Sequence, residues 1–178
     1  METHIGGITT CVEKIVGCLK SVSGTIYMTG IGKSAHVVRK CVATWQSLSI
    51  PAQFLLAQDL LHGDIGILRP DDILIYVSHS GSTSELLQVA SHVRAEFPVK
   101  QMSVSNNPDA ALHKLVDFKI VLSDGPIQEA DLRNKVPTVS CVLFMIALDM
   151  VGILLSEERN FTDAEFRKNH PNGNVHNR

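Results

Sequence analysis

Short apolar runs alternate with amphipathic stretches along most of the chain, and this alternation limits the possible folds more than any other feature. The amphipathic stretches place apolar side chains at helical spacing, as at Val38, Cys41, Val42 and Trp45. The strand-like runs are residues 24–30, 51–56, 71–78, 99–105 and 117–123. Strands that alternate with helices form a parallel sheet covered on both faces. We therefore expect an α/β three-layer sandwich with a five-stranded parallel sheet.

The stretches between and after these runs predict the helices. We expect helices over residues 7–22, 34–48, 82–94, 108–115 and 162–170, and a mostly helical region over 127–155 in two pieces around Pro137. The most apolar segment, residues 139–155, is short for a membrane span and carries Asp149. We interpret it as a buried helix of a soluble protein.

Composition narrows the class of protein. The 178 residues suit one domain, residues 1–178 with a core of about 24–174, and the net charge of −2 argues against a nucleic-acid binder. The first residues lack the basic and apolar regions of a signal peptide. The four cysteines, Cys11, Cys18, Cys41 and Cys141, lie in apolar surroundings without CxxC spacing. We interpret them as small buried side chains in a reducing cytosol, not as metal ligands or disulfides.

Ligands of such sheets bind at the carboxyl ends of the strands, which directs attention to residues 29–34, 78–84 and 123–130. The first loop, "GIGKS", fails as a Walker A motif because Tyr27 stands where a glycine is needed, but it fits the looser dinucleotide pattern GxGxxA. The acidic residue expected at the end of the second strand is missing. Lys33 at a helix start opposes the helix dipole, and an anionic ligand would relieve that conflict.

The second loop, "SHSGSTS", follows a buried strand and precedes a helix. It carries five hydroxyl side chains in seven residues, more than helix capping requires, and Gly81 lets the backbone approach a ligand closely. Such hydroxyls, together with the free amides of a helix start, suit a phosphate group.

With these motifs in place, the chain resembles the sugar isomerase (SIS) domain family, and within it the arabinose-5-phosphate isomerases. The segments "GIGKS", "HGDIG", "VSHSGSTSE" and "NHPNG" occur in the family's order and approximate spacing over about residues 24–174. The resemblance implies a flavodoxin-like SIS fold and a phosphosugar substrate. The CBS repeats that often follow this domain do not occur in the 178 residues.

The resemblance also implies roles for individual residues. Those expected to bind the phosphate are Ser34, Ser78, Ser80, Gly81 and Thr83. Those expected to act in catalysis are Lys33, His62, Glu85, Glu129 and His170, the last reaching a neighbouring subunit's site. The sequence departs from the family pattern at His79, Ser82 and Asn172.

Each catalytic candidate also has a plainer interpretation. Glu85 would be a solvated charge on a helix face, and His62 a loop histidine bonded to Asp64. Glu129 would stabilise a helix N-terminus and His170 a helix C-terminus.

The reaction implied is the interconversion of D-arabinose 5-phosphate and D-ribulose 5-phosphate through an enediol, in a pathway toward the eight-carbon acid sugar of lipopolysaccharide. It needs a base, proton transfer to the oxygens and stabilisation of the enediolate, but chemically no metal, so we expect no cofactor. We assign Glu129 as the base, with its pKa tuned by desolvation. His62 or His170 would move the hydroxyl protons, Lys33 would favour the developing charge, and Glu85 would position a hydroxyl or a histidine.

Two alternatives stay open: another phosphosugar isomerase, such as one acting on 3-hexulose 6-phosphate, and a sugar-phosphate sensor without catalysis. We expect no nucleic-acid or membrane partner. The apolar helix predicts a homodimer or homotetramer, because it exceeds what one small domain needs to cover, and a shared His170 would require one.

Overall fold

The computed structural model describes residues 2–123 and 125–172, with side chains from residue 7 onward. Its centre is a five-stranded, wholly parallel sheet in the order β2-β1-β3-β4-β5, which confirms the predicted fold class. The strands are β1 (Ile26–Gly30), β2 (Ala52–Phe54), β3 (Ile73–Ser78), β4 (Lys100–Ser105) and β5 (Phe118–Val121). All five lie within the runs that the sequence predicts.

The central strand explains why the sheet lies inside the protein. Every residue of β3 is buried, as a strand covered on both faces requires. Ile73, Ile75 and Val77 belong to one hydrophobic cluster, whereas Leu74 and Tyr76 belong to the other. Side chains of a strand alternate between faces, so the two clusters are the two layers of core on either side of the sheet.

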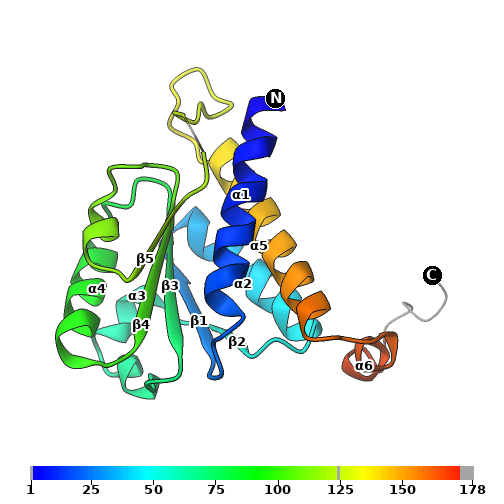
Figure 1. The fold of residues 1–178 in the computed structure, drawn as a ribbon. Coiled ribbons are helices and arrows are strands. Elements are labelled where there is room, and N and C mark those ends of the chain that lie inside the picture. The colour runs from blue at the N-terminus through cyan, green and yellow to red at the C-terminus, as the bar shows by residue number, and fades with distance from the viewer. Residues whose placement is uncertain (1, 124, 173–178) are drawn as a thin grey trace.

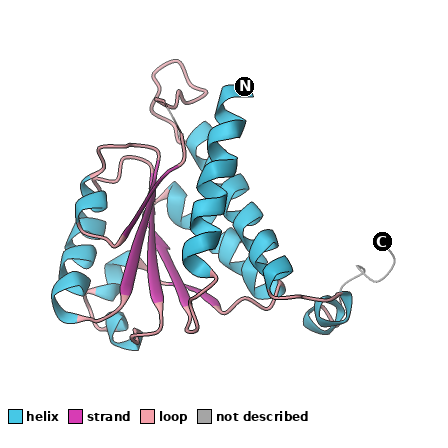
Figure 2. Cartoon of the chain, in the orientation of Figure 1, coloured by secondary structure: helices cyan, strands magenta, loops and turns pink. Residues whose placement is uncertain are grey.

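Helices cover both faces of the sheet (Figures 1 and 2). On one face lie α1 (Glu2–Leu19), α2 (Lys33–Ser47) and α5 (Val139–Glu158). On the other face lie α3 (Ala57–Leu60), α4 (Ser84–Glu96) and the 3-10 turns η1 (Asp64–Ile67) and η2 (Ala111–Lys114). The sequence does not predict α3 and η1. The helix expected over 108–115 is only the short η2.

The apolar helix α5 is a core helix. It is long and apolar enough to cross a membrane by length and composition, but Phe144, Leu148 and Val151 are fully buried against the sheet layer. The Trp45 indole of α2 donates a 2.8 Å hydrogen bond to the Leu148 carbonyl, and Asp149 pairs with Lys40 of α2. These contacts confirm that one face of the helix is buried in the core, whereas Val142, Ile146 and Ile153 on its other face are exposed.

The prediction of helix over 127–138 is wrong. In this segment the Asp131 carboxylate accepts hydrogen bonds from the backbone N–H groups of Arg133, Lys135 and Val136, which closes a compact loop. Asn134 has a positive φ of 53°, and Pro137 cannot donate a backbone hydrogen bond. The helix therefore begins at Val139, after the proline.

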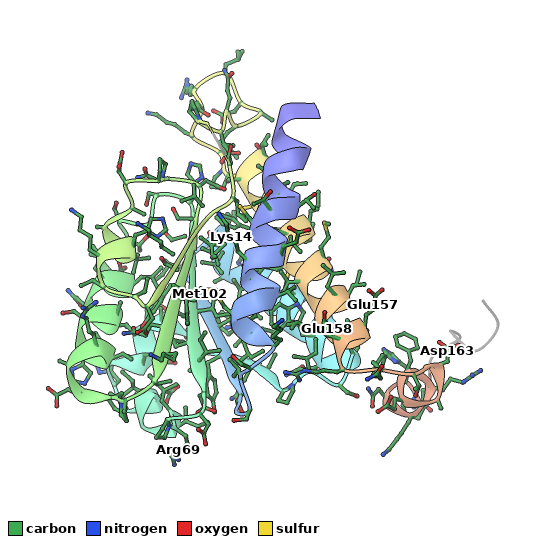
Figure 3. All side chains as sticks on the ribbon, viewed as in Figure 1. Lys14, Arg69, Met102, Glu157, Glu158 and Asp163 are labelled. Atoms are coloured by element: carbon green, nitrogen blue, oxygen red, sulfur yellow. The ribbon has the colours of Figure 1, made fainter. Side chains whose placement is uncertain are left out.

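The last helix, α6 (Asp163–Asn169), lies within the predicted range 162–170 and begins with a Thr162 cap, closed by Glu165 into a capping box. It stands apart from the sheet layers (Figure 1). Figure 3 places its Asp163 and the Arg69 that precedes β3 on the same lower side of the view, opposite the loop between β5 and α5. None of the four cysteines forms a disulfide in the described part of the chain; Cys11 and Cys41 are buried, and Cys18 and Cys141 are half-buried.

Candidate functional site

The site lies where the strand order reverses. From β1 the chain crosses through α2 to β2 on one side, and from β3 it crosses through α4 to β4 on the other. β1 and β3 are neighbours, with Gly30 opposite Val77. The loops that follow these two strands therefore open beside each other at the carboxyl edge, where ligands of open α/β sheets bind.

The first loop places Lys33 and Ser34 in the opening turn of α2. Gly32 caps this helix with φ 60° and offers no side chain to the helix amides. Lys33 is exposed and Ser34 half-buried, and neither side chain forms a hydrogen bond to the described residues. A cation and a hydroxyl thus stand at an uncapped helix start, as predicted from the sequence.

The second loop is an ordered turn rich in hydroxyls. Ser78 Oγ accepts a 3.1 Å hydrogen bond from the Gly81 N–H and lies 3.3 Å from Thr83 Oγ1. Ser80 Oγ accepts a 3.2 Å hydrogen bond from the Ser82 N–H. Gly81 has φ 62°, and a Cβ there would lie 2.2 Å from Ala110 Cβ. We call this loop, residues 78–84, the hydroxyl loop.

Residues at the end of β4 hold the hydroxyl loop in place, and sequence reasoning missed them. Ser105 Oγ donates a 3.0 Å hydrogen bond to the His79 carbonyl, and Asn107 Nδ2 donates one of 3.1 Å to the Ser80 carbonyl. The signal is present as the polar residues of "SVSNN", residues 103–107, at the end of a predicted strand. It becomes informative only with the strand order, which makes β4 the neighbour of β3.

Both helices at the site begin without a side-chain cap. Neither Gly32 of α2 nor Thr83 of α4 makes a capping hydrogen bond, whereas Thr162 of α6 makes a complete capping box. The first N–H groups of a helix need partners, and an anion satisfies them and the dipole together. Two uncapped helix starts beside hydroxyls and Lys33 therefore suit a phosphate or another small anion.

Glu129 lies at the start of a third helix, α5. Its Oε2 accepts hydrogen bonds from the Thr138 N–H at 2.8 Å and from the Ser140 N–H at 3.2 Å. The Thr138 hydroxyl lies 3.1 Å from the same oxygen, and the Ser140 hydroxyl donates to Oε1. The carboxylate is 7% exposed. It thus caps α5, which is the plainer of the two interpretations that its sequence position allowed.

The hydrogen bonds around Glu129 act against the expected tuning of its pKa toward that of a base. Burial is the largest single influence and raises the pKa of Glu129, but the donors from Ser140 and Thr138 together outweigh it and hold the pKa below its ordinary value. Cys141, in the first turn of α5, is influenced by charges from two of the loops. Burial raises the pKa of the Cys141 thiol, the charge of Glu129 raises it further and the charge of Lys33 lowers it.

Glu85 and His62 are both exposed, unlike the buried Glu129. Glu85 lies exposed in the first turn of α4, where a 2.7 Å hydrogen bond from the Ser84 hydroxyl and its own backbone N–H lower its pKa. His62 is exposed in the turn after α3, and its backbone N–H donates to the Asp59 carbonyl. No hydrogen bond joins the His62 ring to Asp64 or to any other described residue.

His170 lies far from the site of its own chain. It follows α6, with Nδ1 2.8 Å from the Phe166 carbonyl, and its neighbour Asn169 bonds Ser47 and Ser49 at the end of α2. Lys33 stands at the other end of that 15-residue helix, a length of about 22 Å. Gly173, the last residue of the "NHPNG" motif, lies outside the described residues.

The arrangement favours an anionic ligand over the alternatives. β2 ends at Phe54 and is followed by Leu55, so no carboxylate stands where a dinucleotide ribose would bind. In the described part of the chain, no three His, Cys, Asp or Glu side chains gather as metal ligands would.

Comparison with known proteins identifies relatives of the chain. The family model described as SIS domain matches residues 20–154. An uncharacterised protein of Chlamydia pneumoniae is 39% identical over 163 residues, which cover 92% of this chain and 47% of that protein. Arabinose 5-phosphate isomerase KpsF of Escherichia coli is 31% identical over 163 residues, covering 92% of this chain and 50% of that enzyme. The chain thus spans about half the length of the curated relatives it matches.

Among solved structures, a protein of Escherichia coli CFT073 in complex with arabinose 5-phosphate superposes with a TM-score of 0.83. It is 26% identical, and the match covers 96% of this chain and 95% of that one.

Proposed function

The chain belongs to the SIS domain family, and from this premise we propose that it is an aldose–ketose isomerase that interconverts D-arabinose 5-phosphate and D-ribulose 5-phosphate. The observation that carries the proposal is the pair of uncapped helix starts at the β1–β3 reversal point, lined by hydroxyls and Lys33. The names of relatives at 31–33% identity support the choice of sugar. A role in making lipopolysaccharide and a cytoplasmic location are part of the proposal, and the names KpsF and KdsD of these relatives support the first of them.

The phosphate would bind at the hydroxyl loop. Ser78, Ser80 and Thr83 would donate from their hydroxyls, while Gly81 allows the backbone to approach the anion. Ser34 and the amides at the start of α2 would complete the binding site from the side of β1.

The proton transfer is assigned to groups around this phosphate position. Glu129 would transfer the proton from one of the carbons C1 and C2 to the other. Lys33 would stabilise the negative charge that develops on the enediolate. Because Ser140 and Thr138 hold the carboxylate ionised and weakly basic, base catalysis requires that ligand binding draw at least one of these donors away. Glu85 would position a hydroxyl or a histidine, and His62 or His170 would move the hydroxyl protons.

The hydrogen bonds that Glu129 accepts at the start of α5 favour a second candidate function, a sugar-phosphate sensor without catalysis. A carboxylate fully used in capping α5 needs no chemical role.

One assay separates the two functions. The protein is incubated with D-ribulose 5-phosphate, and the aldose formed is identified by ion chromatography and NMR. Formation of D-arabinose 5-phosphate supports the proposed reaction, and a different aldose identifies another phosphosugar isomerase. Binding without turnover identifies the sensor. For Glu129→Gln, loss of the base predicts a fall in kcat of about 10²–10⁴-fold, whereas a purely capping role predicts lower stability with kcat retained.

A homo-oligomer with shared sites is part of the proposal. Most of the exposed large apolar side chains lie between residues 132 and 153. They are Leu132, Val136, Val139, Val142, Ile146 and Ile153. The four on α5 recur at helical spacing and form one stripe, which begins beside Ser140 and Cys141 at the site. A second copy of the chain placed here would bring its own residues to that site.

A further inference from the structure

A pocket of about 780 Å³ opens beside the hydroxyl loop, at the carboxyl ends of β3, β4 and β5. His79, Ser80 and Asn106 form part of its polar wall, and Pro126 part of its apolar wall. Its described lining residues include no carboxylate, lysine or arginine. Ser80 belongs to both the pocket and the hydroxyl loop, so the pocket adjoins the proposed phosphate position.

Asn106 has an unusual side chain for a structural residue. It is 5% exposed, and its Nδ2 lies 3.2 Å from His79 Nδ1. Its Oδ1 is buried and has no hydrogen-bond partner in the described part of the chain. Folded proteins rarely leave such an oxygen unpaired, because burial removes water without replacing it. An atom of this kind calls for a partner that the chain itself does not supply.

With a neutral His79 ring, the Asn106–His79 pair presents one donor and one acceptor in either arrangement. When Asn106 Nδ2 donates to His79 Nδ1, the free amide atom is the acceptor Oδ1 and the neutral ring carries its proton on Nε2. When the amide is turned over, Oδ1 accepts from Nδ1–H, the free amide atom is a donor and Nε2 accepts. Either arrangement complements two adjacent hydroxyl groups, one of which donates while the other accepts.

We propose that His79 and Asn106 form a subsite that binds a pair of neighbouring hydroxyls on the sugar chain of the phosphosugar. The inference rests on the proposed function only for the position of the phosphate at the hydroxyl loop. It assigns a specificity role to His79, one of the positions where the sequence departs from the family pattern. It also adds Asn106, which sequence reasoning did not select.

The test measures binding without turnover by titration calorimetry. D-arabinitol 5-phosphate serves as the probe, because it has no carbonyl and cannot isomerise, and inorganic phosphate serves as the reference. The wild-type chain binds the polyol phosphate more tightly than phosphate. Asn106→Leu and His79→Phe each weaken polyol phosphate binding about tenfold and leave phosphate binding unchanged. His79→Gln, which can still exchange hydrogen bonds with the Asn106 amide, restores most of the affinity.

The thermal stability of Asn106→Leu distinguishes a binding role of the side chain from a structural role. Asn106→Leu removes an unpaired buried oxygen together with one hydrogen bond to the exposed His79 ring, which water can replace. Its Tm therefore stays close to or above that of the wild type, whereas a structural role for the side chain lowers it. Pro126→Ala, in the apolar wall of the same pocket, is the matched control and leaves both affinities unchanged.

Other outcomes separate this inference from the proposed reaction. Equal affinity of the wild type for the two probes, or full polyol phosphate affinity in both variants, overturns the subsite. Tight, variant-sensitive binding of D-arabinitol 5-phosphate without any isomerisation of D-arabinose 5-phosphate leaves the subsite standing and overturns the isomerase.

Discussion

Gly81 is the residue on which the hydroxyl loop turns. Replacing it with alanine forces a side chain into a left-handed conformation at φ 62° and drives a Cβ to 2.2 Å from Ala110 Cβ. We expect Gly81→Ala to lower the free energy of unfolding by about 1–2 kcal/mol through the backbone and by about 1–3 kcal/mol through overpacking. Urea denaturation measures the loss, and phosphate affinity falls with it because the hydroxyls move.

Gly32 provides the matched control for that prediction. It has φ 60°, but a Cβ there meets no atom within 4 Å. Gly32→Ala should therefore show only the backbone cost of about 1–2 kcal/mol. The double variant Gly81→Ala/Ala110→Gly should recover the overpacking part. Equal losses in the two single variants would show that Ala110 does not restrict the loop.

Glu129 makes the stability of the protein depend on pH. Its pKa is lowered in the folded chain from an ordinary value of 4.5, so the carboxylate stabilises the fold above that value and loses the effect as pH falls through its folded pKa. Glu129→Gln places an amide donor against the N–H groups of α5. We expect it to cost about 1–3 kcal/mol at pH 7, measured by urea denaturation, with a difference that shrinks below pH 4.5.

Glu165→Gln is the comparison for this effect. Glu165 also has a lowered pKa, because the Thr162 hydroxyl and backbone N–H donate to it, but it is exposed on the short helix α6. Its replacement should change the unfolding of the whole chain much less than that of Glu129. A Glu129→Gln difference that persists unchanged to low pH would mean that packing, not charge, accounts for it.

The sequence predicts the residues of the site better than their partners. The hydroxyls around Gly81 stand out locally, because five in seven residues exceed the needs of a turn. The sequence allows Glu129 a role at a helix N-terminus, but it does not indicate that the helix is α5, which begins after Thr138, nine residues further on. The pairing of Asn106 with His79, 27 positions apart, does not stand out locally. Such contacts depend on strand order and loop closure, which local spacing does not encode.

At the scale of helices and strands, local signals predicted the strands correctly, whereas the prediction of helix over 127–138 failed. The strands were predictable because every residue of a doubly covered strand such as β3 is buried, which leaves an unbroken apolar run. The 127–138 segment has acceptable helix formers. Its conformation is set instead by one side chain, Asp131, which takes three backbone N–H groups that a helix would use.

Helix α5 carries the prediction that belongs to this scale. Val142 and Ile146 are 48% and 44% exposed in the apolar stripe, so a second copy of the chain is expected to cover them. Val142→Asp/Ile146→Asp should convert a dimer or tetramer into a monomer, measured by light scattering, because a buried charge without a partner is costly. The double variant should unfold at nearly the wild-type urea concentration when both are compared as monomers.

The control for α5 is Ile67→Asp on η1. Ile67 is 40% exposed, much like Ile146, but it lies outside the stripe. It should leave the oligomer intact. A wild-type chain that scatters as a monomer at all concentrations would remove the basis for shared sites.

In the whole molecule, the two ends of the sheet hold different parts of the family's motif. The hydroxyl loop, Lys33 and Glu129 gather at the carboxyl ends of the strands, whereas His170 follows a helix attached to the far end of α2. α2 separates them by about 22 Å. Within one chain His170 therefore cannot touch a sugar phosphate bound at the hydroxyl loop. If it takes part in the reaction, it does so in the site of another copy.

Mixing two inactive variants tests this arrangement. Glu129→Gln and His170→Ala each impair every site of their own homodimers. In a mixed dimer with sharing, one site combines the intact Glu129 of one chain with the intact His170 of the other. Random exchange of equal amounts makes half of the dimers mixed, so isomerase activity should return to about a quarter of the wild-type value. Lys33→Met, which alters an exposed side chain, repeats the test without disturbing the α5 cap. If exchange is verified with tagged chains and no activity returns, His170 does not complete the site of a neighbouring chain.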